Sequence, residues 1–485
     1  MYFLKRKHFS IFDKKSAMVI EQLYTNCLAQ GAYFIEHNGE AAVIDPLREV
    51  NQYIELAKSR NAEIKYIFET HFHADFVSGH LTLSEKTGAT IVFGPNAQPN
   101  MDCLICEDGQ EFKLGQLTLR ALHTPGHTME STTYLLIDEN GNELAIFTGD
   151  TLFLGDVGRP DLAQKDTTQT QEELAGILFD SLRTKIMPLP DSVIVYPGHG
   201  AGSACGKNMS KETVGLLGDQ KKSNYALRAN MSKEEFINEV TDGLLEPPSY
   251  FPYNVSLNKN GYSSIESVLA NGQKKLLPEQ ANQLVVNEDA LILDVRSPKE
   301  FIAKHIKNSL FIGLDGTFAP WVGTLINDIQ TPIILVVDES RITEAITRLA
   351  RVGFDNVLGY IPDAPRSWEL SGLACDSLFS ISAEQMAKNL IKSDKPIIDV
   401  RKSTEFQSEH AENALNLPLD SIAQNFSLLP KQEFYLHCAG GYRSVIAASI
   451  LKRSGIDHFI DISGGFGAMK NTSIKISEYV CPSTF

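Results

Sequence analysis

Short apolar runs separated by polar loops dominate the first half of the chain. Runs with the length and composition of buried strands occupy residues 41–44, 64–68, 89–93, 117–122, 131–137, 144–147 and 192–196. Residues 51–60 favour a helix. The runs at residues 64–68, 117–122, 144–147 and 192–196 are each followed by a loop that carries His71, His127, Asp150 or His199. We therefore expect loops at one edge of the sheets to converge on a single site.

The second half contains an internal repeat. Residues 291–296 (LILDVR) recur 105 residues later as residues 396–401 (PIIDVR), and the pair Glu300-Phe301 recurs as Glu405-Phe406. Each copy predicts a helix, a buried strand of the parallel type that ends in Asp-Val-Arg, a short helix and a second strand. The chain therefore carries a small α/β domain twice.

These patterns divide the chain into segments. We expect an N-terminal extension over residues 1–17, a first domain over 18–245, a linker over 246–273, a first repeat copy over 274–375 and a second copy over 376–485. A length of 485 residues also exceeds what one hydrophobic core usually supports. Met18 is an alternative start of translation, because the first strand-like pattern follows it.

Composition and charge narrow the classes of partner. The hydrophobic fraction of 43% and the charged fraction of 21% are typical of a soluble globular protein. A formal net charge of -16 argues against nucleic acid or an anionic membrane as the main partner. The sequence shows neither an apolar run of about 20 residues nor a signal-peptide pattern, so we expect a cytoplasmic protein without a membrane segment.

The cysteines favour a reducing compartment. Their number, seven, is odd, and they are scattered along the chain, which is typical of individual thiols and not of a disulfide framework. Cys103 and Cys106 form a lone C-x-x-C, which we interpret as ordinary loop cysteines in preference to a zinc or redox site. We interpret Cys375 and Cys481 as structural.

Metal-binding residue types gather at the predicted strand ends. The motif positions are Asp45, the run His71-x-His73-x-Asp75, His127 in PGHT, Asp150 in TGDT and His199 in PGHG. This set resembles the metallo-β-lactamase superfamily over about the first 230 residues. The resemblance implies an αββα sandwich with the site on one edge. For many members it also implies a second metal, held by the last two residues of an H-x-H-x-D-H run and by the late histidine.

The chain departs from that run at Phe76, which stands where the final histidine would be. An apolar ring has no lone pair to offer a metal, so we expect one metal per chain. His71, His127 and Asp150 then form a set of two histidines and one carboxylate. Such a set with open positions favours Fe(II) and O2 chemistry over structural zinc.

The remaining polar residues of the motif are expected to surround this metal. His73 is the competing ligand, and we favour a position beside the ligands, where it would orient them. Asp75 and His199 are alternative ligands, for which we expect hydrogen bonds near the site instead. We interpret His123 as an ordinary loop histidine with satisfied hydrogen bonds.

Further segments narrow the resemblance to the persulfide dioxygenase branch of the superfamily, which occurs fused to rhodanese domains. They are residues 153–161 (FLGDVGRPD), 202–207 (GSACGK) and 222–227 (KSNYAL). Members of that branch oxidise the outer sulfur of a low-molecular-weight thiol persulfide with O2, giving sulfite and free thiol. Arg159, Cys205 and Lys207 are candidate substrate contacts. For Cys205, a role in sulfur exchange and a role as a small buried residue are equally open.

The second repeat copy carries a loop suited to sulfur transfer. A predicted strand over residues 433–437 leads into Cys438, and a helix follows from residue 445. Backbone N–H groups and the helix dipole lower the pKa of a cysteine at a helix N-terminus, which suits a nucleophile. Arg443 adds a positive charge that can hold an anionic acceptor such as sulfite. The loop resembles a rhodanese active site and is completed by Ala439, Gly440, Gly441, Tyr442 and Ser444.

The first repeat copy lacks this chemistry. Asp338 occupies the position of the cysteine, the glycines are gone and the loop is shorter. We interpret this copy as an inactive rhodanese-like domain that serves as a scaffold or an interface. An inactive domain is a natural interface, so we expect a homo-oligomer.

Together these features predict an α/β protein with an αββα metallo-β-lactamase sandwich followed by two rhodanese-like domains. The predicted activity is oxidation of a thiol persulfide by O2 at one Fe(II), coupled to sulfur transfer onto sulfite that gives thiosulfate. The main alternative is a zinc thioester hydrolase of the glyoxalase II type with an appended sulfurtransferase. A third is a sulfur carrier or persulfide sensor that uses Cys438 alone. The thiol that carries the persulfide is left open.

Overall fold

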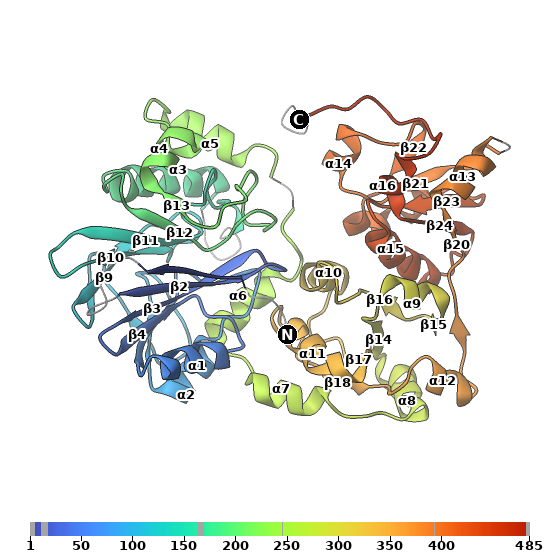
Figure 1. The fold of residues 1–485 in the computed structure, drawn as a ribbon, viewed down its shortest axis with the longest axis horizontal. Helices are drawn as coiled ribbons and strands as arrows, with labels where there is room; N and C mark the ends of the chain where they lie inside the picture. The colour runs from blue at the N-terminus through green and yellow to red at the C-terminus, as the bar shows by residue number, and fades with distance from the viewer. Residues whose placement is uncertain (1–4, 11–17, 163–168, 245, 392, 482–485) are drawn as a thin grey trace. The chain divides into compact units, whose positions relative to one another are not determined.

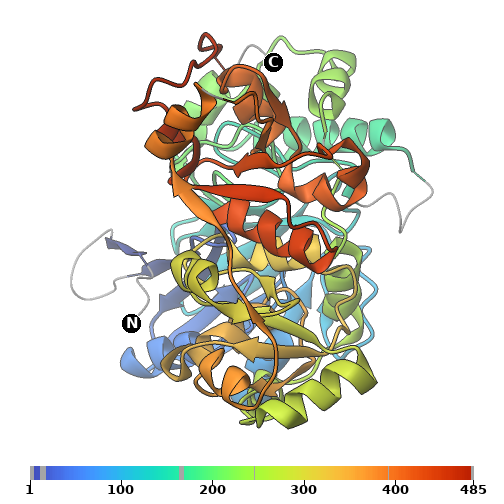
Figure 2. The same ribbon diagram turned by 90° about the vertical axis from the view of Figure 1, so that its right-hand side faces the viewer.

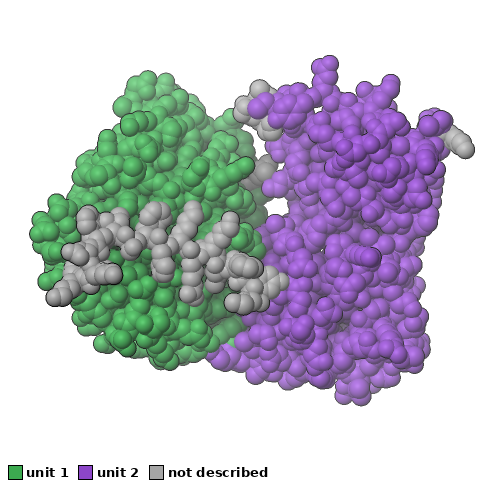
Figure 3. All heavy atoms as spheres, in the orientation of Figure 1, with its two compact units in different colours: residues 1–265, 350–353 green, residues 266–349, 354–485 purple. Residues whose placement is uncertain are grey.

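The computed structural model describes residues 5–10, 18–162, 169–244, 246–391 and 393–481. The chain forms two compact units, which comprise Met1–Ile265 with Ala350–Gly353, and Glu266–Leu349 with Phe354–Phe485 (Figure 3). The first unit contains the predicted sandwich domain, and the second contains both copies of the repeat. Among the described residues, no helix combines the length and the apolar character needed to cross a membrane.

Two facing sheets form the centre of the first unit (Figure 1). The first sheet has the order β1 (Lys5–Ser10), β2 (Val19–Thr25), β3 (Gln30–His37), β4 (Glu40–Ile44), β5 (Glu63–Phe68), β6 (Thr90–Phe93) and β7 (Leu104–Ile105). Its strands are antiparallel from β1 to β4 and parallel from β4 to β7.

The second sheet has the order β13 (Gly215–Leu216), β12 (Ile194–Pro197), β11 (Glu143–Gly149), β10 (Thr132–Ile137), β9 (Leu117–His123) and β8 (Glu111–Leu114). Its neighbouring strands are antiparallel except for β11 and β12. Side chains of both sheets share one core. The rings of Tyr33 on β3 and Phe147 on β11 are 5.1 Å apart, and those of Phe68 on β5 and Tyr134 on β10 are 4.6 Å apart.

Helices cover the outer face of each sheet and complete the αββα sandwich (Figure 1). On the first sheet, α1 (Asn51–Ser59) and α2 (His80–Thr87) bury Tyr53 and Leu83. On the second sheet, α3 and α5 contribute Leu178 and Phe236 to a separate core. The helical segments on this side are α3 (Gln171–Ser181), a π-helix (Leu182–Ile186), α4 (Leu217–Ser223), a 3-10 turn (Tyr225–Leu227) and α5 (Lys233–Thr241).

The segment expected to be a linker contains two helices, α6 (Phe251–Asn260) and α7 (Ile265–Gly272). All of α6 belongs to the first unit. Its buried residues are Phe251, Asn254 and Asn258, which share one face at helical spacing. Two of these three are polar, so the buried face of α6 produces no hydrophobic period in the sequence.

Each repeat copy forms a parallel sheet in the second unit, drawn from yellow to red in Figure 2. The first has the order β16 (Leu310–Phe311), β14 (Leu291–Asp294), β17 (Ile333–Val336) and β18 (Val357–Tyr360). The second has the order β20 (Ser380–Ser382), β24 (Phe459–Ser463), β23 (Phe434–His437), β21 (Ile397–Asp399) and β22 (Ala414–Asn416). A short antiparallel pair joins β15 (His305–Ile306) to β19 (Cys375–Asp376).

Helices connect these strands, as parallel sheets require. In the first copy they are α8 (Pro278–Glu288), α9 (Pro298–Ala303), α10 (Phe318–Leu325), a 3-10 turn (Glu339–Arg341), α11 (Ile342–Ala350) and α12 (Arg366–Leu370). In the second copy they are α13 (Ala383–Leu390), α14 (Ser403–Ser408), a 3-10 segment (Leu419–Leu428), α15 (Tyr442–Arg453) and α16 (Gly465–Met469).

The residues that recur between the copies make the same contacts in both. In the first copy Arg296 pairs with Asp294, and in the second Arg401 pairs with Asp399, each with an Nη2–Oδ2 distance of 2.6 Å. After each pair, a phenylalanine ring stacks on a histidine ring, with centroids 3.9 and 4.0 Å apart. The repeated sequence therefore forms the same ion pair, the Asp-Val-Arg clasp, at the end of β14 and at the end of β21.

Candidate metal centre and sulfur-transfer loop

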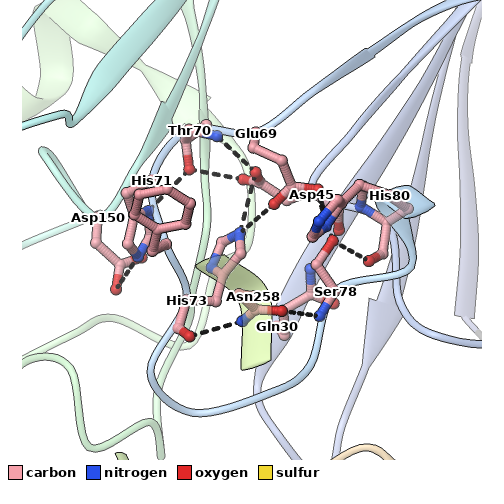
Figure 4. A network of polar contacts seen from close by, with 12 residues as sticks. Gln30, Asp45, Glu69, Thr70, His71, His73, Ser78, His80, Asp150 and Asn258 are labelled. Atoms are coloured by element: carbon pink, nitrogen blue, oxygen red, sulfur yellow. Dashed lines mark hydrogen bonds and ion pairs between the residues drawn. The ribbon is translucent and has the colours of Figure 1, made fainter. Parts of the chain in front are cut away.

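Loops at the ends of strands bring the predicted metal-binding residues of the first unit together. Strand β5 leads to His71, the loop between β9 and β10 carries His127, β11 ends just before Asp150, and β12 leads to His199. Each of these residues is at most 2% exposed. Ligand atoms of His71, His127 and Asp150 lie within 4.8 Å of one another, and these three residues form the triad (Figure 4 labels two of them).

The side chains of the triad are aimed at a common point. His127 Nε2 lies 3.5 Å from Asp150 Oδ2, and His71 Nε2 lies 3.9 Å from it. Asp150 Oδ2 has no hydrogen-bond partner among the described residues. A buried carboxylate oxygen without a partner is costly, and a cation between the three groups would satisfy it. The triad therefore fits a metal ion held by two imidazoles and one carboxylate.

Hydrogen bonds determine which ring nitrogens face that point. His127 Nδ1 donates to the carbonyl oxygen of Arg159 at 2.8 Å. The Thr70 hydroxyl donates to Asp45 Oδ2 at 2.9 Å, so its oxygen accepts from His71 Nδ1, also at 2.9 Å. Nε2 of both rings therefore keeps its lone pair, as ligation requires. Burial lowers the pKa of His71 well below its usual value, which favours the neutral ring.

His199 bridges two carboxylates beside the triad. Its Nδ1 lies 2.7 Å from Asp150 Oδ1, and its Nε2 lies 2.8 Å from Asp75 Oδ2. Burial disfavours its charged form, but the two carboxylates outweigh burial and raise the pKa of His199 to about 10. Asp75, His199 and Cys205 form a second group, with ligand atoms within 4.8 Å of one another. Burial, together with the same two carboxylates, raises the pKa of the Cys205 thiol well above its usual value.

Two of the three candidate substrate contacts are held by neighbouring residues. The Arg159 guanidinium donates two hydrogen bonds of 2.7 Å to the carboxylate of Asp161. Lys207 Nζ donates to the carbonyl oxygens of Glu239 at 2.8 Å and Asp242 at 2.6 Å, which ties its loop to α5 and the residue after it. That Arg159, Lys207 or Cys205 contacts a substrate stays a prediction.

His73 points away from the triad, as Figure 4 shows. Its Nε2 lies 3.1 Å from Asp45 Oδ1 and 3.4 Å from Glu69 Oε2. On its other side the ring packs against Phe76, with centroids 4.3 Å apart. The ring centroid is also 4.3 Å from that of His71. His73 therefore lies beside the triad and faces a different pair of carboxylates.

The sequence did not predict two residues that lie close to these groups, Asn258 and Tyr250. Asn258 of α6 donates through Nδ2 to the carbonyl oxygens of His73 and Phe76, both at 2.8 Å, and its Oδ1 accepts from the Ser78 backbone N–H at 2.8 Å. Tyr250 is 3% exposed, and burial and the negative charges of the second group raise the pKa of its hydroxyl well above its usual value. Neither residue belongs to a motif, so the sequence offered no signal for them.

In the second unit, Cys438 follows β23 and precedes α15. Its Sγ accepts a hydrogen bond from the Gly441 backbone N–H at 3.1 Å. Gly441 has a φ of 99°, a left-handed conformation that glycine adopts without strain, and α15 begins at the next residue. The Cys438 residue is 1% exposed. The thiol thus lies at a helix N-terminus and contacts a backbone donor, as the loop sequence predicts.

Hydrogen bonds to carboxylates of the second copy hold Arg443 and Ser444 of this loop in place. The Arg443 guanidinium donates to both carboxylate oxygens of Glu405, at 2.6 and 2.8 Å. Ser444 Oγ donates to Asp461 Oδ1 at 2.8 Å. The predicted binding of an anionic acceptor by Arg443 therefore requires the acceptor to compete with the Glu405 carboxylate.

The first copy contacts the same loop. The Tyr442 hydroxyl donates to the carbonyl oxygen of Gly313 at 2.7 Å. A Cβ placed on Gly316 would lie 2.2 Å from Tyr442 Cζ, so the ring lies directly against that backbone. Asp338, which replaces the cysteine in this copy, is exposed at the start of a 3-10 turn. This copy carries no thiol at that position and contacts the loop that does.

Comparison with known families agrees with this architecture. The metallo-beta-lactamase superfamily matches residues 26–101. The rhodanese-like domain matches twice, over residues 277–362 and 382–472. Similarity to a solved structure covers more of the chain. A metallo-beta-lactamase from Staphylococcus aureus is 30% identical and covers 72% of this chain and 99% of its own, with a TM-score of 0.62.

Curated relatives of the first unit include two activities. The mitochondrial persulfide dioxygenase ETHE1 of Bos taurus is 29% identical over 45% of this chain and 78% of its own length. A probable hydroxyacylglutathione hydrolase of Schizosaccharomyces pombe is 30% identical over 34% of this chain, and the match spans 60% of the hydrolase. A cytoplasmic hydroxyacylglutathione hydrolase of Arabidopsis thaliana is 32% identical over 34% of this chain, and the match again spans 60% of the hydrolase. The chain belongs to the metallo-beta-lactamase superfamily and joins one such domain, with persulfide dioxygenase homologues, to two rhodanese-like domains.

Proposed function

We propose that the first unit is a persulfide dioxygenase that uses a single Fe(II) held by His71, His127 and Asp150. The orientation of His73 carries this proposal. Its ring faces Asp45 and Glu69, so the triad contains two histidines and one carboxylate and no further histidine of the motif. This ligand set leaves open positions and suits Fe(II) and O2.

The residues around the triad prepare it for this chemistry. Thr70 and the carbonyl of Arg159 orient the two rings. His199 holds Asp150 through Oδ1 and leaves Oδ2 directed at the rings. Fe(II) bound there would supply neighbouring positions for the persulfide sulfur and O2.

The reaction balances with a persulfide, O2 and water as reactants. RSSH, O2 and H2O give RSH, sulfite and two protons. The bond between the two sulfur atoms breaks, the sulfur pair loses four electrons, and O2 accepts them. The relationship to persulfide dioxygenase and rhodanese homologues supports a small sulfur compound as the substrate.

The second unit would convert the sulfite to thiosulfate. The Cys438 thiolate attacks the outer sulfur of another persulfide, and the thiol leaves with the proton. A sulfite lone pair then attacks the sulfur held on Cys438, the S–S bond breaks, and thiosulfate departs. The Gly441 N–H and the N-terminus of α15 stabilise the negative sulfur in both steps. Joining both activities in one chain raises the effective concentration of the intermediate.

A zinc thioester hydrolase is the second candidate for the first unit. The hydroxyacylglutathione hydrolase relatives favour it. The second group, Asp75, His199 and Cys205, also favours it, because it offers ligands for a second metal beside the triad. A pair of metals would activate water for hydrolysis.

Oxygen consumption separates the two candidates. The full chain, purified without O2 and supplied with Fe(II), should consume O2 with glutathione persulfide or coenzyme A persulfide and form one thiosulfate per O2, or one sulfite per O2 when Cys438 is replaced by serine. The His127→Ala chain should lose this uptake, because it lacks one ligand of the triad. Hydrolysis of a glutathione thioester without O2 uptake by the wild-type chain would overturn the proposal and favour the hydrolase.

A further inference from the structure

A third group of metal-ligating side chains lies apart from the triad. Asp45 follows β4, Glu69 follows β5, and His73 comes four residues later in the loop. Their ligand atoms lie within 4.8 Å of one another, and each residue is 1% exposed. Among the described residues, neither carboxylate has a lysine or arginine within ion-pair distance. The group shares no residue with the triad, and Figure 4 shows the two side by side.

Hydrogen bonds hold both carboxylates in place but leave the histidine without one. Asp45 accepts from the backbone N–H of Thr70 at 2.8 Å and from its hydroxyl at 2.9 Å. Glu69 Oε1 accepts from Ser78 Oγ at 2.5 Å. Neither ring nitrogen of His73 makes a hydrogen bond of acceptable geometry with any described residue, although Nε2 lies close to both carboxylates. Burying such a group without a partner is costly.

The spacing of these atoms matches the edges of a metal tetrahedron. Zinc binds imidazole nitrogen and carboxylate oxygen at about 2.0–2.1 Å, so neighbouring ligands in a tetrahedral site lie about 3.3 Å apart. His73 Nε2 lies 3.1 Å from Asp45 Oδ1 and 3.4 Å from Glu69 Oε2. A hydrogen bond would need the N–H to point at one oxygen, whereas a cation between the three atoms needs no such alignment.

A second buried imidazole without a hydrogen-bond partner in the described part of the chain lies next to Glu69. His80, the first residue of α2, is 0% exposed, and neither of its ring nitrogens has a hydrogen-bond partner among the described residues. Its Nδ1 lies 3.6 Å from Glu69 Oε1. His80 does not share the 4.8 Å limit with all three ligand atoms of the group, so it lies beside the group and is not one of its ligands.

We propose that Asp45, Glu69 and His73 bind a zinc ion through three protein ligands, separate from the catalytic metal. The zinc joins the ends of β4 and β5 and holds His73 away from the triad. Since Glu69 and His73 flank His71 in the chain, the zinc also positions the first ligand of the triad. This proposal is independent of the reaction assigned to the first unit.

Zinc binding can be counted in a chain whose triad is broken. The full-length His127→Ala chain is stripped with a chelator, incubated with Zn2+ alone, desalted and measured by mass spectrometry of metals. We expect one zinc per chain. Adding Glu69→Gln should remove that zinc, whereas adding Cys205→Ser, which alters the second group, should retain it. Glu21→Gln is a matched control, because it neutralises another buried carboxylate of the same sheet outside all three groups.

X-ray absorption at the zinc edge gives a result that does not depend on how well the Glu69→Gln chain folds. The His127→Ala chain should show nitrogen and oxygen ligands with imidazole scattering and no sulfur. The proposal is overturned if this chain binds no zinc, if the zinc has a sulfur ligand, or if Cys205→Ser and not Glu69→Gln removes it. If the chain binds no zinc, the two carboxylates hold His73 as a protonated ring. Each of these outcomes leaves the O2-uptake test of the first unit unaffected.

Discussion

Replacing Asn258 by alanine should loosen the loop that carries His71 and Asp75. The Asn258 side chain is the one described group that joins the backbone at His73, Phe76 and Ser78, through three hydrogen bonds of 2.8 Å. The residue is 2% exposed, so water cannot readily replace these bonds. Alanine at this position leaves two carbonyl oxygens and one N–H buried without partners.

The magnitude follows from those three groups. Each buried backbone group without a partner costs about 1–3 kcal/mol. Partial relaxation of the loop reduces the sum, and losses above about 4–5 kcal/mol are exceptional for one substitution. We therefore expect the free energy of opening this loop to fall by about 3–5 kcal/mol, which corresponds to exchange that is about a hundred to several thousand times faster.

Hydrogen–deuterium exchange of the peptide that covers residues 69–80 is the suitable assay. Both tryptophans, Trp321 and Trp368, lie in the second unit, so their fluorescence does not monitor this loop. The Ser78 amide is the most direct probe, because its N–H donates to Asn258. Peptides from the second unit should exchange as in the wild-type chain.

Asn254→Ala provides the matched control. Asn254 lies one turn earlier on α6 and is 0% exposed, and neither its Oδ1 nor its Nδ2 has a hydrogen-bond partner among the described residues. The Asn254→Ala substitution removes the same atoms as Asn258→Ala but breaks no hydrogen bond between described residues. Equal acceleration of exchange in the two variants would show that packing of α6, and not the bonds of Asn258, holds the loop.

Three further predictions concern the second unit. Cys438→Ser should leave O2 uptake unchanged and shift the product from thiosulfate to sulfite, because serine cannot carry sulfur; unchanged thiosulfate by ion chromatography would refute the role of Cys438. Gly316→Ala should slow sulfur transfer severalfold, because the added Cβ would lie 2.2 Å from Tyr442 Cζ and displace the loop; a wild-type rate would mean that the ring yields freely. Burial lowers the pKa of His437, so below about pH 6.5 the unfolded chain takes up a proton that the folded chain does not. Stability of the second unit, followed by tryptophan fluorescence in urea, should therefore fall as the pH drops below about 6.5, and His437→Gln should flatten this dependence if the ring is its source.

The sequence by itself determined the plan of the chain and the identity of its reactive groups. Buried strands, the repeat and the Cys438 loop are visible because each depends on residues close together in the chain. The Asp-Val-Arg clasp closes between residues two apart, and the Cys438 thiol meets a donor three residues later. Strand ends also showed where His71, His127, Asp150 and His199 would gather, since loops at one edge of a sheet are neighbours.

Only the tertiary structure decided where the side chains of this site point. His73 faces Asp45, which follows another strand, whereas the sequence left open whether His73 would bind the metal. Asn258 reaches the loop from 180 residues downstream of Ser78, and Glu405 meets Arg443 across 38 residues. The physical reason is that the direction of a buried polar side chain depends on the charges and donors around it. Long-range folding brings those groups together, and no local pattern of residues records them.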